Sequence, residues 1–98
     1  MDINFATGWK KHPGIPGAFH LEYADGITSA SIVTGPRGSG LMAVNDPDRG
    51  VTLYEAWFDG MQDPMGYLTL EEIQGIVKYI HERRREDQMY KEIEVSKN

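Results

Sequence analysis

Residues 69–80 carry the feature that most constrains the fold: a helix with a defined start and one apolar side. Thr69 and Glu72 form the pattern Thr-x-x-Glu. In this pattern the threonine side chain accepts from the first helical turn, and the glutamate reaches back to the threonine backbone. Apolar residues then recur at spacings of three and four, at Leu70, Ile73, Ile76, Val77 and Ile80. A helix with one apolar side needs another element to cover it, so we predict an amphipathic helix over 69–90 that docks on a sheet.

The end of this helix differs from its start. After Ile80 the apolar side becomes polar, so we expect contact with the core to end near His81 and the basic run Arg83–Arg85 to be solvated. Met89 and Ile93 project at about 100° and 140° from Leu70, counting about 100° per residue. They lie almost opposite the first stripe, so either the helix frays before them or they contact something outside this core.

Residues 18–58 have the pattern of a β-meander. Phe19, Leu21 and Tyr23 alternate with polar residues, which is typical of a half-buried strand. Asp25-Gly26 then predicts a tight hairpin turn, and 27–33 is rich in β-branched residues that favour a return strand.

Two further strands are predicted over 41–44 and 51–58, with turn residues at 45–50 between them. The 51–58 strand has bulky residues on both faces, which indicates a central position. In the irregular segment 1–17, the stretch 10–17 is expected to lie outside any sheet or helix because Pro13 and Pro16 restrict the backbone. The sequence thus predicts a single α+β domain, an antiparallel meander of three to four strands packed against one long C-terminal amphipathic helix. Residues 91–98 are predicted to be a tail, although 91–95 alternates and also fits a short strand.

Composition excludes several classes of protein. The 98-residue chain has no cysteine, so neither disulfides nor thiolate metal sites can support it. Its apolar runs are far shorter than the roughly 20 residues that a membrane span needs, and residues 1–5 lack the pattern of a signal peptide. We therefore expect a cytoplasmic protein without membrane contact. The net charge of −5 argues against nucleic-acid binding, which requires basic surface.

The glycine-rich stretch 35–40 fits two nucleotide-binding motifs only in part. Its glycine spacing matches a P-loop, but Leu41-Met42 stand where lysine and a hydroxyl residue are needed. The dinucleotide-binding pattern requires a helix next, and Pro47 interrupts the chain too early. What remains is a small anionic ligand or nucleotide held by the loops, and the candidate residues are Trp9, Arg37, Gly38, Ser39 and Asp48.

Catalytic and metal-binding patterns are weaker still. The acidic residues near 46–48 do not fit a calcium loop, and His12, His20 and His81 form no metal-binding pair. No serine lies in a nucleophile elbow. Glu22, Glu55 and Asp59 could form an acid–base pair across strands, but any antiparallel sheet can bring carboxylates together in this way. We therefore predict no catalytic residue, no metal and no cofactor, and rank a hydrolase-type enzyme third among the functional hypotheses.

The preferred hypothesis is a small non-enzymatic binding or regulatory protein that contacts a protein partner or a second copy of itself. An inhibitor that a virus directs against a host factor would be one such protein. Thioethers and aromatic rings at a surface make adaptable contacts. The candidate partner-binding residues are Trp57, Met61, Met65, Tyr67, Met89 and Ile93.

Overall fold

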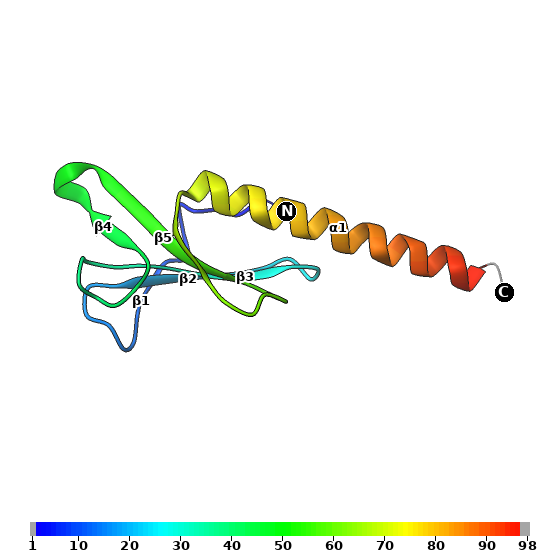
Figure 1. Ribbon diagram of the computed structural model, residues 1–98, viewed down its shortest axis with the longest axis horizontal. Helices are drawn as coiled ribbons and strands as arrows, with labels where there is room; N and C mark the ends of the chain where they lie inside the picture. The colour runs from blue at the N-terminus through cyan, green and yellow to red at the C-terminus, as the bar shows by residue number, and fades with distance from the viewer. Residues whose placement is uncertain (1, 97–98) are drawn as a thin grey trace.

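The chain forms one antiparallel sheet with one long helix against it (Figure 1), as the computed structural model shows for the backbone of residues 2–96 and the side chains of residues 2–89. The predicted α+β class is confirmed, but residues 2–96 contain six strands rather than three to four. In chain order the elements are β1 Lys10–Lys11, β2 Phe19–Ala24, β3 Ser29–Thr34, β4 Val44–Asp46, the 3₁₀ helix η1 Pro47–Arg49, β5 Val51–Phe58, β6 Met65–Leu68 and the helix α1 Leu70–Ser96.

β5 is the central strand, as its two bulky faces indicated. Its second half pairs with β3, its first half pairs with β4, and residues near its middle pair with β6. The order β1-β2-β3-β5-β4 corrects the prediction of a simple meander, because β3 pairs with β5 and not with the strand that follows it. Loop 35–43 separates β3 from β4, and Asn45 N donates to Gly35 O across 2.8 Å to close the base of that loop.

The predicted hairpin is confirmed in β2 and β3, where Leu21 faces Ile32. Gly26 has φ +86° at the first central position of the turn, where glycine meets no steric penalty. The Asp25 carboxylate accepts from the backbone nitrogens of Ile27 and Thr28. An aspartate that bonds the backbone two and three residues ahead fixes the turn.

Several strand boundaries differ from the predictions. Lys10 and Lys11 form β1 against His20 and Phe19, because the first proline comes only at position 13 and leaves both backbone N–H groups free to pair. The strand predicted over 41–44 begins at Val44. No strand was predicted between 58 and the helix, yet β6 begins at Met65 and pairs with β5 through a bulge.

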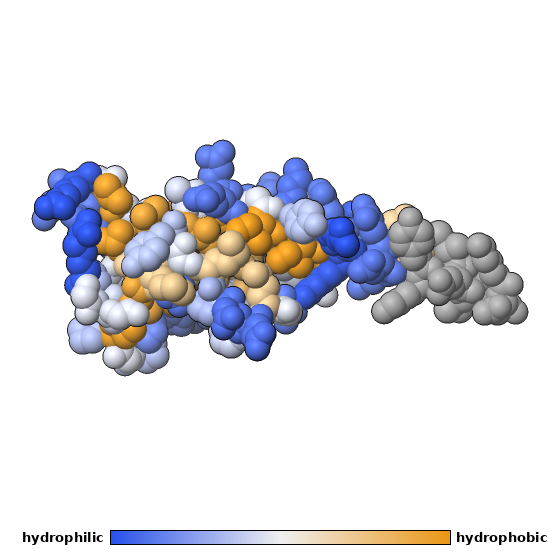
Figure 2. Space-filling view, viewed as in Figure 1, coloured by the Kyte–Doolittle hydropathy of each residue, from blue (hydrophilic) through white to orange (hydrophobic). Residues whose placement is uncertain are grey.

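The core lies between α1 and one face of the sheet. Ile73 and Val77 of the helix are fully buried, and so are Ile32, Ala56 and Phe58 of the sheet. Figure 2 shows apolar residues gathered along the side of the molecule where the helix meets the sheet. The predicted capping box is also present. Glu72 N donates to Thr69 Oγ1 across 3.1 Å, and Thr69 N donates to Glu72 Oε1 across 3.0 Å.

Replacing Thr69 by alanine is expected to lower the free energy of unfolding by about 1 kcal/mol, because it leaves an orphan N–H in the first helical turn. Urea denaturation followed by circular dichroism measures this change. Thr7→Ala, at an exposed position in the N-terminal segment, is the control. Equal effects of the two substitutions would show that the capping box adds nothing to stability.

The helix is longer than predicted. It continues to Ser96 rather than ending near 90, which excludes the alternative strand over 91–95. Its C-terminal half extends past the end of the sheet (Figure 1), and the molecule measures 60 × 24 × 21 Å along its principal axes. Within residues 2–96, α1 is the longest helix and is too polar to cross a membrane.

Candidate interaction surface

The two faces of the sheet have different surroundings. Successive strand residues point to opposite faces, so the buried Ala30, Ile32, Ala56 and Phe58 define the face that α1 covers. Residues between them point away from the helix. In β3 these are Ser29, Ser31 and Val33, all half-buried, and in β5 they are Glu55 and Trp57. We call this side the uncovered face.

A row of three residues crosses the uncovered face. Glu22 of β2 is paired with Ser31 of β3, and Ser31 is paired with Trp57 of β5. Neighbouring strands lie about 4.8 Å apart, so the backbones of Glu22 and Trp57 lie about 10 Å apart, with the backbone of Ser31 between them. The next row continues through Ser29. These rows border a shallow hollow of about 250 Å³, which Asp59, Gly60 and Met61 close.

Trp57 is the main apolar group of this surface. It is 54% exposed, far more than its buried neighbours in β5. Its Nε1 donates to Met61 O across 2.7 Å, so the indole has a fixed orientation and places Met61 at the edge of the hollow. Among the predicted partner-binding residues, Trp57 and Met61 are therefore brought together at one site.

The other predicted partner-binding residues lie elsewhere. Met65 is half-buried and packs against the core on the helix side. Tyr67 is 59% exposed in β6, and Met89 is 55% exposed on the far half of α1. Ile93 belongs to the helix, but its side chain lies outside the described residues.

The predicted ligand-binding residues do not share one set of contacts. Trp9 packs against Tyr54 with ring centroids 5.6 Å apart and donates Nε1 to Phe5 O. Arg37 instead lies 3.4 Å from Asp46 Oδ2, so an anion would have to compete with this carboxylate.

The remaining residues of that prediction are exposed or internally bonded. Gly38 and Asp48 are exposed. Ser39 donates its backbone N–H to Pro36 O, while its buried hydroxyl has no hydrogen-bond partner among the described residues.

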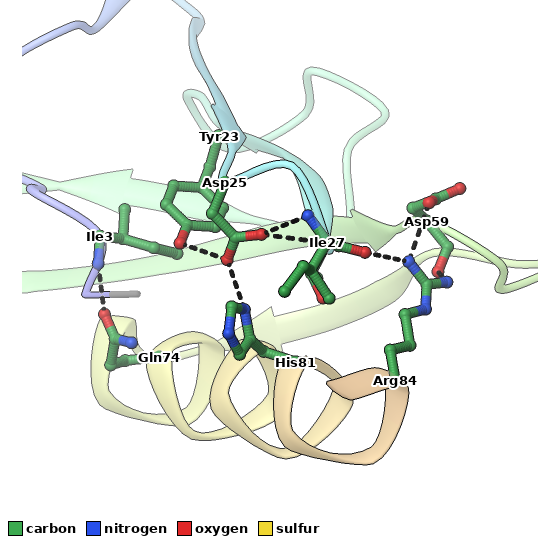
Figure 3. A network of polar contacts seen from close by, with 9 residues as sticks. Ile3, Tyr23, Asp25, Ile27, Asp59, Gln74, His81 and Arg84 are labelled. Carbon is green, nitrogen blue, oxygen red and sulfur yellow. Dashed lines mark hydrogen bonds and ion pairs between the residues drawn. The ribbon is translucent and has the colours of Figure 1, made fainter. Parts of the chain in front are cut away.

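A polar cluster joins the β2–β3 turn to the helix (Figure 3). The Asp25 carboxylate accepts from the Tyr23 hydroxyl across 2.7 Å and lies 2.8 Å from His81 Nδ1. Burial alone would raise the pKa of Asp25, but the hydrogen bonds from Thr28, Tyr23, Ile27 and His81 together hold it well below its usual range. Burial, together with the Asp25 charge, raises the pKa of Tyr23 to about 12.

Arg84 extends this cluster by one turn of the helix. It donates to Ile27 O and to both the carboxylate and the backbone oxygen of Asp59. The prediction that all of Arg83–Arg85 is solvated is therefore wrong for Arg84. Gln74 also accepts from Ile3 N. These polar contacts therefore attach the helix to the β2–β3 turn, to the end of β5 and to the N-terminal segment.

One pattern in the sequence of β3 indicates which face of the sheet the helix leaves uncovered. Ser29 and Ser31 alternate with Ala30 and Ile32, which marks the two sides of β3 as different in polarity. Combined with the pairing of Ser31 and Trp57, this alternation identifies the face that the helix leaves open. No protein-family model, curated protein or solved structure matches this chain.

Proposed function

We propose that this chain is a non-enzymatic binding domain that holds a protein partner on the uncovered face of its sheet. The observation that carries the proposal is Trp57, a half-exposed indole whose orientation is fixed by the Met61 carbonyl. Aromatic residues and methionine are enriched where proteins bind one another, and a rigid tryptophan loses little entropy when a partner covers it.

The surroundings of Trp57 support the same use. Small serines form the floor of the hollow, while Glu22 and Asp59 are polar groups on its border. An apolar centre with a polar border is the usual arrangement of a protein interface. The hollow of about 250 Å³ is shallow, which suits one side chain of a partner better than a whole cofactor, since cofactor sites are typically about 300–1,000 Å³ and enclosed.

The test compares Trp57→Ser with Tyr79→Ser. Tyr79 is 62% exposed but lies on the helix, so it controls for the loss of an exposed aromatic ring. Proteins captured from the native cell by the wild type and by each variant are quantified by mass spectrometry, and the best candidate is purified for calorimetry. We expect Trp57→Ser to weaken its binding at least about ten-fold, as for an aromatic hot spot, and Tyr79→Ser to change it less than about two-fold.

Two results would contradict the proposal. A partner whose affinity is the same for the wild type and Trp57→Ser would bind elsewhere on the molecule. Equal losses in the two variants would indicate a general effect of removing aromatic rings. Circular dichroism of both variants confirms beforehand that the fold is intact.

A further inference from the structure

The hollow beside Trp57 has a chemistry that selects its occupant. On one side stands the Glu22 carboxylate, whose side chain is 65% exposed. On the other side stands the Trp57 indole, and Ser31 lies between them in the same row. A carboxylate facing an aromatic ring across a floor of hydroxyl groups is complementary to a cation with a flat face.

Glu22 is already oriented for such a contact. The Ser31 hydroxyl donates to Glu22 Oε1 across 2.8 Å, and His20 Nδ1 lies 3.7 Å from the same oxygen. Within residues 2–89 the hydrogen bond and the ion pair of the Glu22 carboxylate both involve Oε1, which leaves Oε2 to accept from an incoming donor. The bonds of Ser31 and Met61 thus hold the carboxylate and the indole in place before any partner arrives.

Asp59 contributes less negative charge than Glu22. Its carboxylate is 3.0 Å from Arg84 Nη1, and this pair belongs to the contact between the helix and the sheet. Glu22 is therefore the principal charge of the hollow, and the net charge of −5 for the whole chain favours the approach of a basic partner.

We infer that the hollow receives an arginine side chain from an extended, basic segment of the partner. The inference rests on the proposed function and names the chemistry of what binds there. The guanidinium stacks on the face of Trp57 and donates to Glu22 Oε2, while the hydroxyl oxygens of Ser29 and Ser31 accept from its remaining N–H groups. Arginine fits better than lysine because its planar guanidinium can stack on an indole while an N–H group at its edge donates to a carboxylate oxygen.

The experiment uses two peptides and the two tryptophans of the chain. One probe is acetyl-Ser-Val-Arg-Val-Ser-amide, and the other is the same peptide with neutral citrulline in place of arginine. Each is titrated into ¹⁵N-labelled protein while the two indole N–H resonances are followed. Trp57→Phe assigns the resonances, and Trp9, which packs on Tyr54, is the internal control.

The arginine peptide is expected to shift the Trp57 indole resonance and leave the Trp9 resonance in place. Its affinity should exceed that of the citrulline peptide by about ten-fold, as one exposed cation–π contact and one exposed ion pair together imply. Glu22→Gln keeps the size of the side chain and removes its charge, so it should reduce this ratio to about two-fold. Added salt should reduce the ratio in the wild type as well.

Several outcomes would overturn the inference. Equal affinities for the two peptides would mean that the hollow binds a peptide without recognising charge, which refutes the arginine assignment and leaves the proposed function standing. The assignment also fails if Trp57 responds to neither peptide, or if Glu22→Gln leaves the ratio unchanged. The proposed function fails separately, when loss of Trp57 does not weaken a captured partner.

Discussion

Replacing Asp25 by alanine is expected to lower the free energy of unfolding by about 3 kcal/mol. The Asp25 carboxylate is the acceptor for four donors, and the substitution leaves all four without it. The donors are the Tyr23 hydroxyl, His81 Nδ1 and the backbone nitrogens of Ile27 and Thr28. Each buried donor left without an acceptor costs about 1–3 kcal/mol, and water reaches part of this site, which reduces the sum. Urea denaturation at pH 7 measures the change.

Asp48→Ala is the matched control, since Asp48 is an exposed aspartate in η1, and it should change stability by less than about 0.5 kcal/mol. A double-mutant cycle between Asp25→Ala and His81→Ala isolates the bond that joins turn and helix, and its coupling should be about 1 kcal/mol. A coupling energy near zero would show that the contact between His81 and Asp25 does not stabilise the fold.

The pH dependence of this effect follows from the lowered pKa of Asp25. Because the folded-state pKa lies below the ordinary value of 3.8, the ionised carboxylate stabilises the fold above that value. This stabilisation is lost as the pH falls from 3.8 toward the lower folded-state pKa. The stability difference between the wild type and Asp25→Asn should therefore shrink on acidification. A difference that grows on acidification would contradict the assigned direction.

Local signals explain which elements could be predicted from the sequence. The capping box at Thr69 and the Asp25-Gly26 turn both depend on neighbouring residues, and the structure confirms both. The prediction of strand 51–58 was also correct to its ends, because this segment is rich in β-branched and aromatic residues and lies between two glycine-containing turns. Each of these elements is determined within about ten residues of chain.

Non-local contacts explain what could not be predicted. β6 contains Gly66, and the backbone of its Tyr67 has a positive φ that is unfavourable for a residue other than glycine. Its strand structure therefore comes from pairing with β5. The contact between His81 and Asp25 joins residues 56 positions apart, and no spacing rule links them. The candidate interaction surface was predicted from the sequence only in part. Trp57 and Met61 were selected for their chemistry, whereas Glu22 joins them only through the registers of β2, β3 and β5.

Replacing Gly66 by alanine is expected to destabilise the fold by about 2–3 kcal/mol, because no space exists for the added methyl group. A Cβ at Gly66 would lie 2.5 Å from Met42 Cβ, which is attached directly to the backbone and cannot rotate away. The adjacent Tyr67 is held at φ +53°, where non-glycine residues are rare, and its N–H donates to Met42 O across 2.8 Å. Met42 N in turn donates to Glu55 Oε2, so the added methyl group would push apart a contact that connects loop 35–43 with β5 and β6.

Gly75→Ala is the matched control, since a Cβ at Gly75 meets nothing within 4 Å. In the interior of α1 this change should stabilise the protein by about 0.5–1 kcal/mol. The two substitutions add the same methyl group and should move the urea midpoint in opposite directions. Met42→Gly removes the clashing Cβ, so it should recover part of the loss when combined with Gly66→Ala. If Gly66→Ala is as stable as the wild type, Met42 does not pack closely on β6, and the proposed clash between the two Cβ atoms is wrong.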